Sequence, residues 1–229
     1  MTVALIAGAA SGIGAACARE LRDVGLQVVG LDLQPAADVD LALVADVTDR
    51  AAVAAAVAQA EEALGPVDAL VNSAGHYEMV PFAEVTREQL ERMVRVHVGG
   101  LFNLCRAVVP GMVERRHGSV VAVTSELAIG GGDGDSHYAA AKGAVIGFVR
   151  SLAVELAPTG VRVNAVAPGP TDTPLLAADS PWRDPAFLAT LPSRRLVRPE
   201  EIAVTVSYLV NHTSFTCGEI ISPNAGAVI

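Results

Sequence analysis

The sequence predicts an α/β protein with three layers, in which helices cover both faces of a doubly wound, seven-stranded parallel sheet. Short β-branched runs alternate with alanine-rich helical stretches along the chain, which is typical of βαβ units. Apolar residues make up 52% of the 229 residues, as expected where both faces of a parallel sheet are covered. No low-complexity linker or charge run divides the chain, so we expect a single domain over residues 1–229.

Seven β-branched runs are the expected strands. They lie near Val3 to Ala7, Gln27 to Leu31, Ala42 to Ala45, Ala69 to Val71, Ser119 to Val123, Arg162 to Ala165 and Glu219 to Ile221.

The longest helix is expected to begin at a capping box formed by Thr86 and Gln89. Gly99 and Gly100 lie inside this helix, where each glycine costs about 1 kcal/mol relative to alanine. We expect a neighbouring backbone to pack closely against these two glycines.

The alternation of strands and helices fails between Pro168 and Pro199, a stretch with seven prolines. A long irregular segment in a compact domain is usually a binding loop or a lid. We therefore predict a substrate-binding lid at about residues 170–199.

Composition argues against several classes of partner. The net charge of −9 does not suit a nucleic acid or an anionic membrane, since phosphate binding needs a basic face. The first residues lack the basic segment of a signal peptide, and we expect no membrane span. Three cysteines without metal-type spacing fit a reduced cytoplasm better than a disulfide framework. We expect a cytoplasmic protein.

A glycine-rich turn follows the first strand directly and precedes an amphipathic helix. Its Gly8, Gly12 and Gly14 permit a tight turn in which a pyrophosphate approaches the N–H groups at the start of the helix. Asp32 ends the second strand 18 residues after Gly14, where a carboxylate accepts both ribose hydroxyls of an adenosine and repels a 2′-phosphate. Asp32 as an ordinary solvated loop residue is the alternative. We favour NAD over NADP.

Tyr138 and Lys142 are spaced i, i+4, and Lys142 is the only lysine in the chain. On a helix this spacing places both side chains on one face. An ammonium there favours the ionised phenol, so Tyr138 becomes a candidate acid or base near neutral pH. A single Tyr-x-x-x-Lys pattern also occurs in ordinary helices, so other segments have to decide between the two interpretations.

The order of these motifs resembles the short-chain dehydrogenase/reductase family, a family with a Rossmann-type fold, over essentially the whole chain. Ser125 precedes Tyr138 by 13 residues, as in the family. The residues that the resemblance assigns to cofactor binding are Gly8, Ser11, Gly12, Ile13, Gly14, Asp32, Asp46, Val47, Asn72, Ala74, Gly75, Tyr138, Lys142, Pro168, Gly169, Thr171 and Thr173. Ala7 stands where the family usually has Thr, and Ser73 replaces one Asn of its Asn-Asn-Ala-Gly segment.

The resemblance implies an NAD(H)-dependent oxidoreductase that moves a hydride between the nicotinamide and a secondary alcohol or ketone. Tyr138 is then the acid/base, Ser125 donates a hydrogen bond to the substrate oxygen, and Lys142 holds the nicotinamide ribose and keeps the tyrosine acidic. Thr173 and the backbone near Thr171 orient the carboxamide. The family is commonly tetrameric, so we expect a homo-oligomer, tetramer or dimer, that uses the long helix and the helix carrying Tyr138.

His97 departs from the family pattern, because an Asn usually occupies this catalytic position in the long helix. In the family, a water on the backbone carbonyl of this Asn links the lysine to solvent. His97 keeps that carbonyl and adds an imidazole that titrates near pH ~6.5. Two interpretations stay open: a titrating member of an altered proton relay, or a structural substitute held by backbone hydrogen bonds.

The expected substrate pocket is lined by His76, Tyr77, Leu127, Leu175, Leu176 and Trp182, and the lid adds Phe187 and Leu188. This lining favours an apolar or alicyclic substrate. We interpret His76 and His137 as wall residues rather than acids or bases. Asp133 and Asp135 lie in a glycine-rich loop that has too few ligands for calcium, so we expect a solvated flexible loop and no metal.

Two alternatives to an oxidoreductase remain open. The first is a catalytically impaired NAD-binding regulator or scaffold, suggested by His97 and opposed by the presence of Ser125, Tyr138 and Lys142. The second is a cofactor-free lyase of the haloalcohol type, opposed by Lys142 and the intact glycine turn. The sequence leaves open the identity and stereochemistry of the substrate and the physiological direction of the reaction.

Overall fold

The computed structural model describes residues 2–228 and contains the expected parallel sheet. Its strands are β1 (Val3–Ala7), β2 (Gln27–Asp32), β3 (Leu41–Val44), β4 (Val67–Asn72), β5 (Gly118–Val123), β6 (Val161–Val166) and β7 (Ile220–Ile221). They pair in the order β3-β2-β1-β4-β5-β6-β7, and every pair is parallel. All seven predicted strands are confirmed, with ends that differ by one or two residues.

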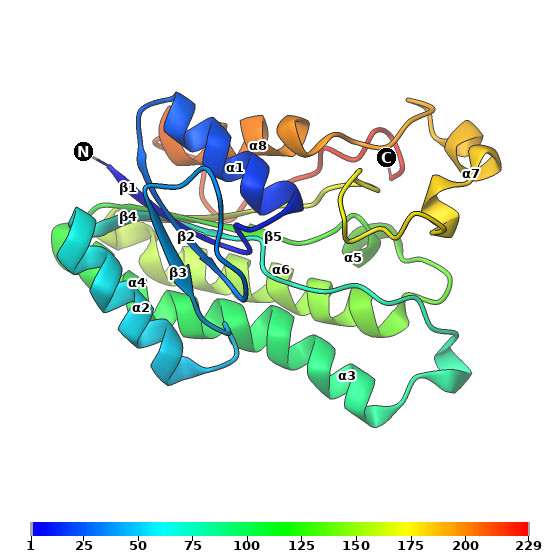
Figure 1. Cartoon of the computed structure of the whole chain (residues 1–229), viewed down its shortest axis with the longest axis horizontal. Coiled ribbons are helices and arrows are strands. Elements are labelled where there is room, and N and C mark those ends of the chain that lie inside the picture. The colour runs from blue at the N-terminus through cyan, green and yellow to red at the C-terminus, as the bar shows by residue number, and fades with distance from the viewer. Residues whose placement is uncertain (1, 229) are drawn as a thin grey trace.

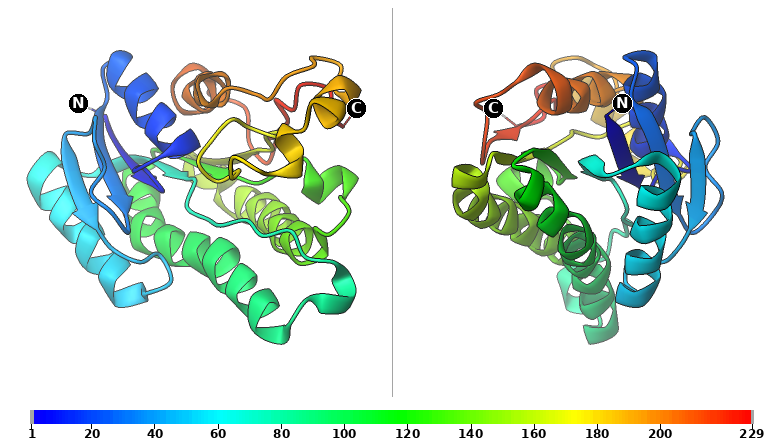
Figure 2. Two further views of the ribbon diagram at one scale, coloured as in Figure 1. Left: turned by 45° about the vertical axis from the view of Figure 1, so that its right-hand side comes forward. Right: turned by 90° about the vertical axis from the view of Figure 1, so that its left-hand side faces the viewer.

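Helices cover both faces of the sheet (Figure 1). The helices are α1 (Gly12–Asp23), α2 (Arg50–Leu64), α3 (Arg87–Val94), α4 (Gly100–Arg115), α5 (Leu127–Gly130), α6 (Ser136–Leu156), α7 (Pro185–Thr190) and α8 (Pro199–Ser207). The π-helical turns are η2 (Arg95–Gly99) and η5 (Tyr208–His212), and the 3-10 turns are η1 (Phe82–Glu84), η3 (Ala157–Thr159) and η4 (Pro181–Arg183). Figure 2 shows from two further directions that α1 and α8 lie on one face, with α2, α4 and α6 on the other.

Two separate apolar cores follow from this layering. One core joins the sheet to α2, α4 and α6 and includes Leu70, Leu104 and Val149. The other joins the opposite face to α1 and α8 and includes Leu21 and Ile202. The strands are therefore buried on both faces, as their continuous β-branched runs predict.

The long helix of the sequence is a continuous stretch in which α3, η2 and α4 follow one another. It begins at the predicted capping box, where Thr86 Oγ1 accepts from Gln89 N at 3.2 Å and Gln89 Oε1 accepts from Thr86 N at 2.8 Å. The expectation that a neighbouring backbone packs closely against Gly99 and Gly100 is wrong. A Cβ on Gly100 would lie 2.7 Å from the Val47 side chain rather than against a backbone, and Gly99 is not crowded.

The same stretch, Arg87–Arg115, is the one helix within residues 2–228 that is long and apolar enough to span a membrane, with a mean hydropathy of 1.3 over an 18-residue window. Its apolar residues Leu101, Leu104, Val108 and Met112 are buried against the sheet. The core helix of a globular domain meets the same criteria of length and composition.

The helix carrying Tyr138 uses part of its apolar face within the monomer. Val145 and Val149 belong to the main core, and Phe148 and Leu152 pack against it. These residues need no subunit contact to explain their burial.

Candidate active site

The carboxyl ends of the parallel strands meet at one edge of the sheet, and the chemistry-bearing residues lie there. A cavity of about 410 Å³ runs along this edge. It is lined by residues from the turns after β1, β2, β3, β4, β5 and β6, and by the segment after β6. Such an edge is the usual ligand site of open α/β sheets.

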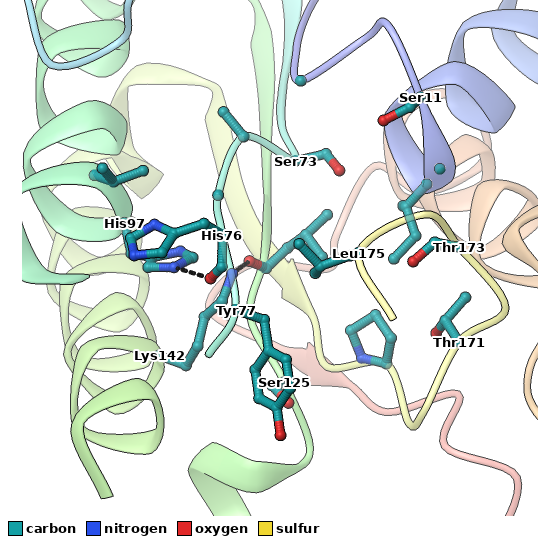
Figure 3. Close-up of a pocket in the computed structure, with 18 of the residues that line it drawn as sticks. Ser11, Ser73, His76, Tyr77, His97, Ser125, Lys142, Thr171, Thr173 and Leu175 are labelled. Carbon is teal, nitrogen blue, oxygen red and sulfur yellow. Dashed lines mark hydrogen bonds between the residues drawn. The ribbon is translucent and has the colours of Figure 1, made fainter. Parts of the chain in front are cut away.

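The cavity brings together nearly all the residues singled out from the sequence. Those lining it are Gly8, Ser11, Gly12, Ile13, Asp32, Asp46, Val47, Ala74, Gly75, His76, Tyr77, His97, Ser125, Leu127, Tyr138, Lys142, Pro168, Gly169, Thr171, Thr173, Leu175, Leu176 and Trp182. Gly14 and Asn72 do not line it, nor do His137, Phe187 and Leu188. Figure 3 shows Ser11, Thr171 and Thr173 on one side of this pocket, and His76, His97 and Lys142 on the other.

The glycine turn is held in a shape that leaves no room for side chains. A Cβ on Gly14 would lie 1.9 Å from Gly8 O, and one on Gly8, at φ +82°, would lie 2.7 Å from Ala74 N. Ser11 is the N-cap of α1, but its hydroxyl makes no capping hydrogen bond. The start of α1 therefore offers open N–H groups and a free hydroxyl to an anion, which suits a pyrophosphate.

The Asp32 carboxylate is fixed beside this turn. Its Oδ2 accepts from Ala10 N at 3.0 Å, and its Oδ1 accepts from Leu33 N at 2.6 Å. Asp46 Oδ1 likewise accepts from Thr48 N at 2.8 Å at the end of β3. The turn, the helix start and the two carboxylates together fit the adenosine and pyrophosphate of a dinucleotide.

Lys142 and Tyr138 share one face of α6, as their spacing predicts. The two residues are 6% and 8% exposed, and Lys142 Nζ lies 5.7 Å from the centroid of the Tyr138 ring. Lys142 Nζ donates to Val123 O at 2.8 Å, and Thr124 Oγ1 donates to Lys142 O at 2.8 Å. These two bonds tie α6 to the end of β5.

The sequence predicts that Lys142 keeps Tyr138 acidic with help from the cationic ring of NAD⁺, and in the structure Lys142 by itself does not offset the burial of the phenol. Burial, followed by the negative charge of Glu126, raises the pKa of the Tyr138 phenol above its ordinary value, while the Ser125 hydroxyl acts in the opposite direction. Burial also lowers the pKa of Lys142 to about 7, so its charge is itself destabilised. A lower phenol pKa therefore requires further positive charge in the cavity.

Ser125 stands at the end of β5 and makes two hydrogen bonds. Its Oγ donates to Glu126 Oε2 at 2.9 Å and accepts from Leu127 N at 3.2 Å. Glu126 is 5% exposed and also lines the cavity. Sequence reasoning missed Glu126, although an acidic residue directly after Ser125 at the end of a buried strand is a signal that points to it.

His97 lies in the π-helical turn η2 and is 2% exposed. Its Nε2 lies 2.9 Å from His76 O, drawn as a dashed line in Figure 3. Because a carbonyl oxygen only accepts, Nε2 carries the proton, and Nδ1 has no partner within residues 2–228. Burial, and then the charge of Lys142, lowers the pKa of His97 well below its ordinary value. Titration near pH ~6.5 is therefore not supported, and a neutral imidazole held by a backbone carbonyl fits the structure.

His76 and His137 share a carboxylate that the sequence did not reveal. Glu78 Oε1 lies 4.0 Å from His76 Nε2 and 3.8 Å from His137 Nε2, and it accepts from Arg92 Nη2 at 2.8 Å. His76 is a wall residue of the cavity, whereas His137 is buried beside Glu78 and does not reach the cavity.

The glycine-rich loop before α6 is not simply a solvated loop. Asp135 is fully buried, and its Oδ1 accepts from Tyr77 Oη at 2.8 Å. Tyr77 Oη accepts in turn from Trp182 Nε1 at 2.7 Å, so a chain of hydrogen bonds links this loop to the segment 170–199. Asp133 is exposed, as expected.

The segment 170–199 contributes Leu175, Leu176 and Trp182 to the lining of the cavity. Arg183 donates to Asp172 Oδ1 at 2.7 Å and to Leu176 O at 3.2 Å, which holds Trp182 in place. The Trp182 ring packs on Phe187 with 4.8 Å between centroids, which explains why Phe187 stays outside the cavity. Arg183 is thus engaged within the segment and does not enter the cavity.

This fold and this site define an oxidoreductase with a Rossmann-type nucleotide-binding fold. The family described as "Enoyl-(Acyl carrier protein) reductase" matches residues 8–227. The chain belongs to the short-chain dehydrogenase/reductase family, which confirms the resemblance and implies a nicotinamide cofactor.

Similar proteins cover the whole chain. The chain is 34% identical to 3-oxoacyl-[acyl-carrier-protein] reductase FabG of Thermotoga maritima, over 99% of this chain and 98% of that protein. It is 34% identical to the acetoacetyl-CoA reductase of Acinetobacter sp., over 98% of this chain and 96% of that protein. The crystal structure of levodione reductase superposes with a TM-score of 0.91 at 31% identity, covering 98% of this chain and 96% of that one.

Proposed function

We propose that the protein is an NAD(H)-dependent oxidoreductase that transfers a hydride between the nicotinamide and a secondary alcohol or ketone. The observation that carries the proposal is the convergence of Ser125, Tyr138 and Lys142 at one end of a cavity whose other end holds Asp32. The relatives named as 3-oxoacyl and acetoacetyl-CoA reductases support a carbonyl group as the reacting centre.

Each residue of the centre has one task. Tyr138 takes the carbinol proton in oxidation and returns it in reduction. Ser125 hydrogen-bonds to the same oxygen, and Lys142 holds the nicotinamide ribose near Tyr138. Bound NAD⁺ supplies the hydride acceptor and a positive charge that favours the Tyr138 phenolate. Thr171 and Thr173 are both buried, Thr173 beside Gly12 of the glycine turn, and they orient the carboxamide.

NAD is the proposed cofactor because the Asp32 carboxylate occupies the place that a 2′-phosphate needs. Among residues 2–228 no lysine or arginine lines the cavity except Lys142, which is bonded to the end of β5, whereas Asp32 ends β2. Wild type should use NAD⁺ with a kcat/KM at least about tenfold above that for NADP⁺, and Asp32→Ala should narrow that ratio. A wild-type preference for NADP⁺ would contradict the assignment.

The substrate is proposed to be small, with an apolar or alicyclic body. Leu127, Leu175, Leu176 and Trp182 provide an apolar wall, and the segment 170–199 acts as the lid over it. A panel of secondary alcohols and ketones tests this substrate class. Each reaction is monitored by the absorbance of NADH. Tyr138→Phe is the control, since it keeps the shape of the site and removes the acid/base hydroxyl.

The same panel separates the enzyme from a regulator that binds cofactor without turnover. NADH binding is measured by fluorescence in parallel. Tight NADH binding with no turnover of any alcohol or ketone would favour the regulator, whereas turnover that depends on Tyr138 supports the enzyme.

The protein is also proposed to act as a cytoplasmic homo-oligomer, tetramer or dimer. Apolar side chains of Leu90, Val94 and Phe102 are exposed on α3 and α4, where a partner subunit would cover them. Sedimentation at working concentration tests this, and a monomer would remove the proposal.

A further inference from the structure

Glu126 is a buried acid at the centre of the proposed active site, and the roles proposed above do not use it. Its Oε2 accepts the Ser125 proton at 2.9 Å. Its Oε1 accepts no hydrogen bond within the part of the chain that the structure describes, and it is not enclosed by protein atoms. Glu126 lines the cavity, and Oε1 is its carboxyl oxygen that is neither hydrogen-bonded nor enclosed, so we take it as the atom open to a substrate.

Within residues 2–228 the Ser125 hydroxyl is the one side-chain donor to this carboxyl group, and the backbone N–H groups of Glu126 and Leu127 also stabilise its charge. No lysine, arginine or histidine among residues 2–228 forms an ion pair with it, and the nearby charged side chain that acts on it is the acid Asp135. Burial raises the pKa of Glu126 to about 7; the hydrogen bonds from Ser125 and the backbone lower it, and Asp135 adds a smaller rise. A buried carboxylate of this kind is strongly stabilised by one more donor.

The position of Ser125 fixes where that donor has to be. The Ser125 hydroxyl has one proton, which it donates to Glu126 in the structure and would turn to the reacting oxygen of the substrate in the proposed reaction, so both groups lie within reach of Ser125 Oγ. A group that reaches Oε1 must therefore be carried by the substrate close to its reacting carbon. A donor on the adjacent carbon satisfies this requirement.

A hydroxyl fits the site better than an ammonium group. Lys142 Nζ already places one cationic group beside Tyr138 in this cavity, and its pKa is lowered by burial. A second cation would add repulsion and would itself have to lose its water shell. A hydroxyl donates to Oε1 without either penalty.

We propose that Glu126 is a substrate-recognition residue that binds a second hydroxyl on the carbon next to the reacting carbinol, so that the substrate class is a vicinal diol or the corresponding α-hydroxy ketone. This inference rests on the proposed oxidoreductase function and names its substrate class. The carbinol C–H bond breaks and its hydride passes to the nicotinamide, while the carbinol proton passes to Tyr138. The diol is oxidised to an α-hydroxy ketone, NAD⁺ is reduced to NADH, and the second hydroxyl stays intact on Glu126.

The test compares kcat/KM with NAD⁺ for cyclohexanol and for the cis and trans vicinal cyclohexanediols. These alcohols share one ring and differ in the second hydroxyl. Wild type should favour at least one diol over cyclohexanol by about tenfold to a hundredfold, the range for a hydrogen bond to a charged acceptor. Glu126→Leu should bring the diol-to-cyclohexanol ratio of kcat/KM close to one. Glu126→Gln keeps an acceptor oxygen without the charge, so its ratio should lie between those of wild type and Glu126→Leu.

A matched control separates recognition from a general effect of charge. Asp133→Asn removes an exposed negative charge from the neighbouring loop and should leave the diol-to-cyclohexanol ratio unchanged. NADH binding and the unfolding temperature of each variant show whether the site is intact, and the ratio is independent of the amount of active protein.

The outcomes distinguish the inference from the proposed function. If cyclohexanol is oxidised as well as either diol, or if Glu126→Leu keeps the diol preference, recognition by Glu126 is wrong and the oxidoreductase stands. A stronger preference for a vicinal aminocyclohexanol than for both diols would contradict the choice of a hydroxyl. If none of these alcohols yields NADH, the proposed function fails and the inference fails with it.

Discussion

The Ser125 hydroxyl donates its proton to the Glu126 carboxylate, with 2.9 Å between Oγ and Oε2. A side chain that is expected to polarise the substrate oxygen is thus held by a neighbouring acid that also faces the cavity. The charge on Glu126 therefore affects both the orientation of Ser125 and the binding of a second hydroxyl.

The preference for a diol should depend on pH. The pKa of Glu126 is raised to about 7, so the carboxylate, the better acceptor, predominates above that pH. The diol-to-cyclohexanol ratio of kcat/KM should rise between about pH 6 and pH 8 in wild type and stay flat in Glu126→Gln. Asp135, Tyr77 and Tyr138 are the other titratable groups that act on Glu126. Lys142 affects both substrates, so its titration cancels in the ratio.

His97→Asn should leave the pH dependence of kcat unshifted between about pH 5.5 and pH 8. The His97 imidazole is buried, and burial followed by the charge of Lys142 lowers its pKa well below the ordinary value, which favours the neutral ring. Rate measurements on both proteins over the same buffers check the prediction. A shifted inflection in the variant would restore the titrating role of His97.

Gly75 and His97 should be coupled in stability. A Cβ on Gly75 would lie 2.4 Å from His97 Cε1, so Gly75→Ala should destabilise the protein by about 1–3 kcal/mol. In the His97→Ala background the ring is gone, and the same substitution should cost much less. Urea unfolding of the four proteins of this double-mutant cycle measures the coupling, and additive effects would contradict the contact.

Lys142→Met should abolish turnover and change the pH dependence of stability. Burial lowers the pKa of Lys142 from 10.5 to about 7, so between these values the unfolded chain binds more protons than the folded one. Wild type therefore gains stability as the pH rises through this window, and the stability is lost again as the pH falls. The difference in unfolding temperature, Lys142→Met minus wild type, should be largest near pH 7 and should decline toward pH 10.5. A constant difference would show that the ammonium is not destabilised.

Tyr77→Phe should weaken substrate binding rather than cofactor binding. It removes the acceptor for Trp182 Nε1 and leaves Asp135 Oδ1 without its donor. We expect KM for the alcohol to rise about tenfold, because a buried unpaired group costs about 1–3 kcal/mol, while the Kd of NADH stays unchanged. Tyr208→Phe, at a half-exposed tyrosine on η5, is the control. If KM for the alcohol and the Kd of NADH rise equally in Tyr77→Phe, Tyr77 has no specific role in the lid.

The parts of the site that depend on local spacing were predictable from sequence. Tyr138 and Lys142 share a helix face, and Asp32 ends a strand next to the glycine turn, because such placements follow from helix and strand geometry. The parallel strands and the helices on both faces of the sheet follow from the βαβ alternation in the same way.

The remaining parts depend on contacts between distant segments. Tyr77 and Trp182 are 105 residues apart, and their hydrogen bond has no counterpart in local sequence. The burial of Asp135 in a loop of glycines and the raised pKa of Tyr138 likewise follow from packing, which spacing does not report.

Transfer of deuterium from a secondary alcohol labelled at the carbinol carbon to NAD⁺ tests the Ser-Tyr-Lys centre most directly. Wild type should deliver the label to one face of nicotinamide C4, as seen by NMR of the reduced cofactor. Tyr138→Phe should bind NADH with a similar Kd and transfer the label at least about a hundredfold more slowly, the lower end of the range for losing a general acid/base. Transfer at an unchanged rate in Tyr138→Phe, or its absence in wild type across the panel of alcohols, would contradict the proposed chemistry.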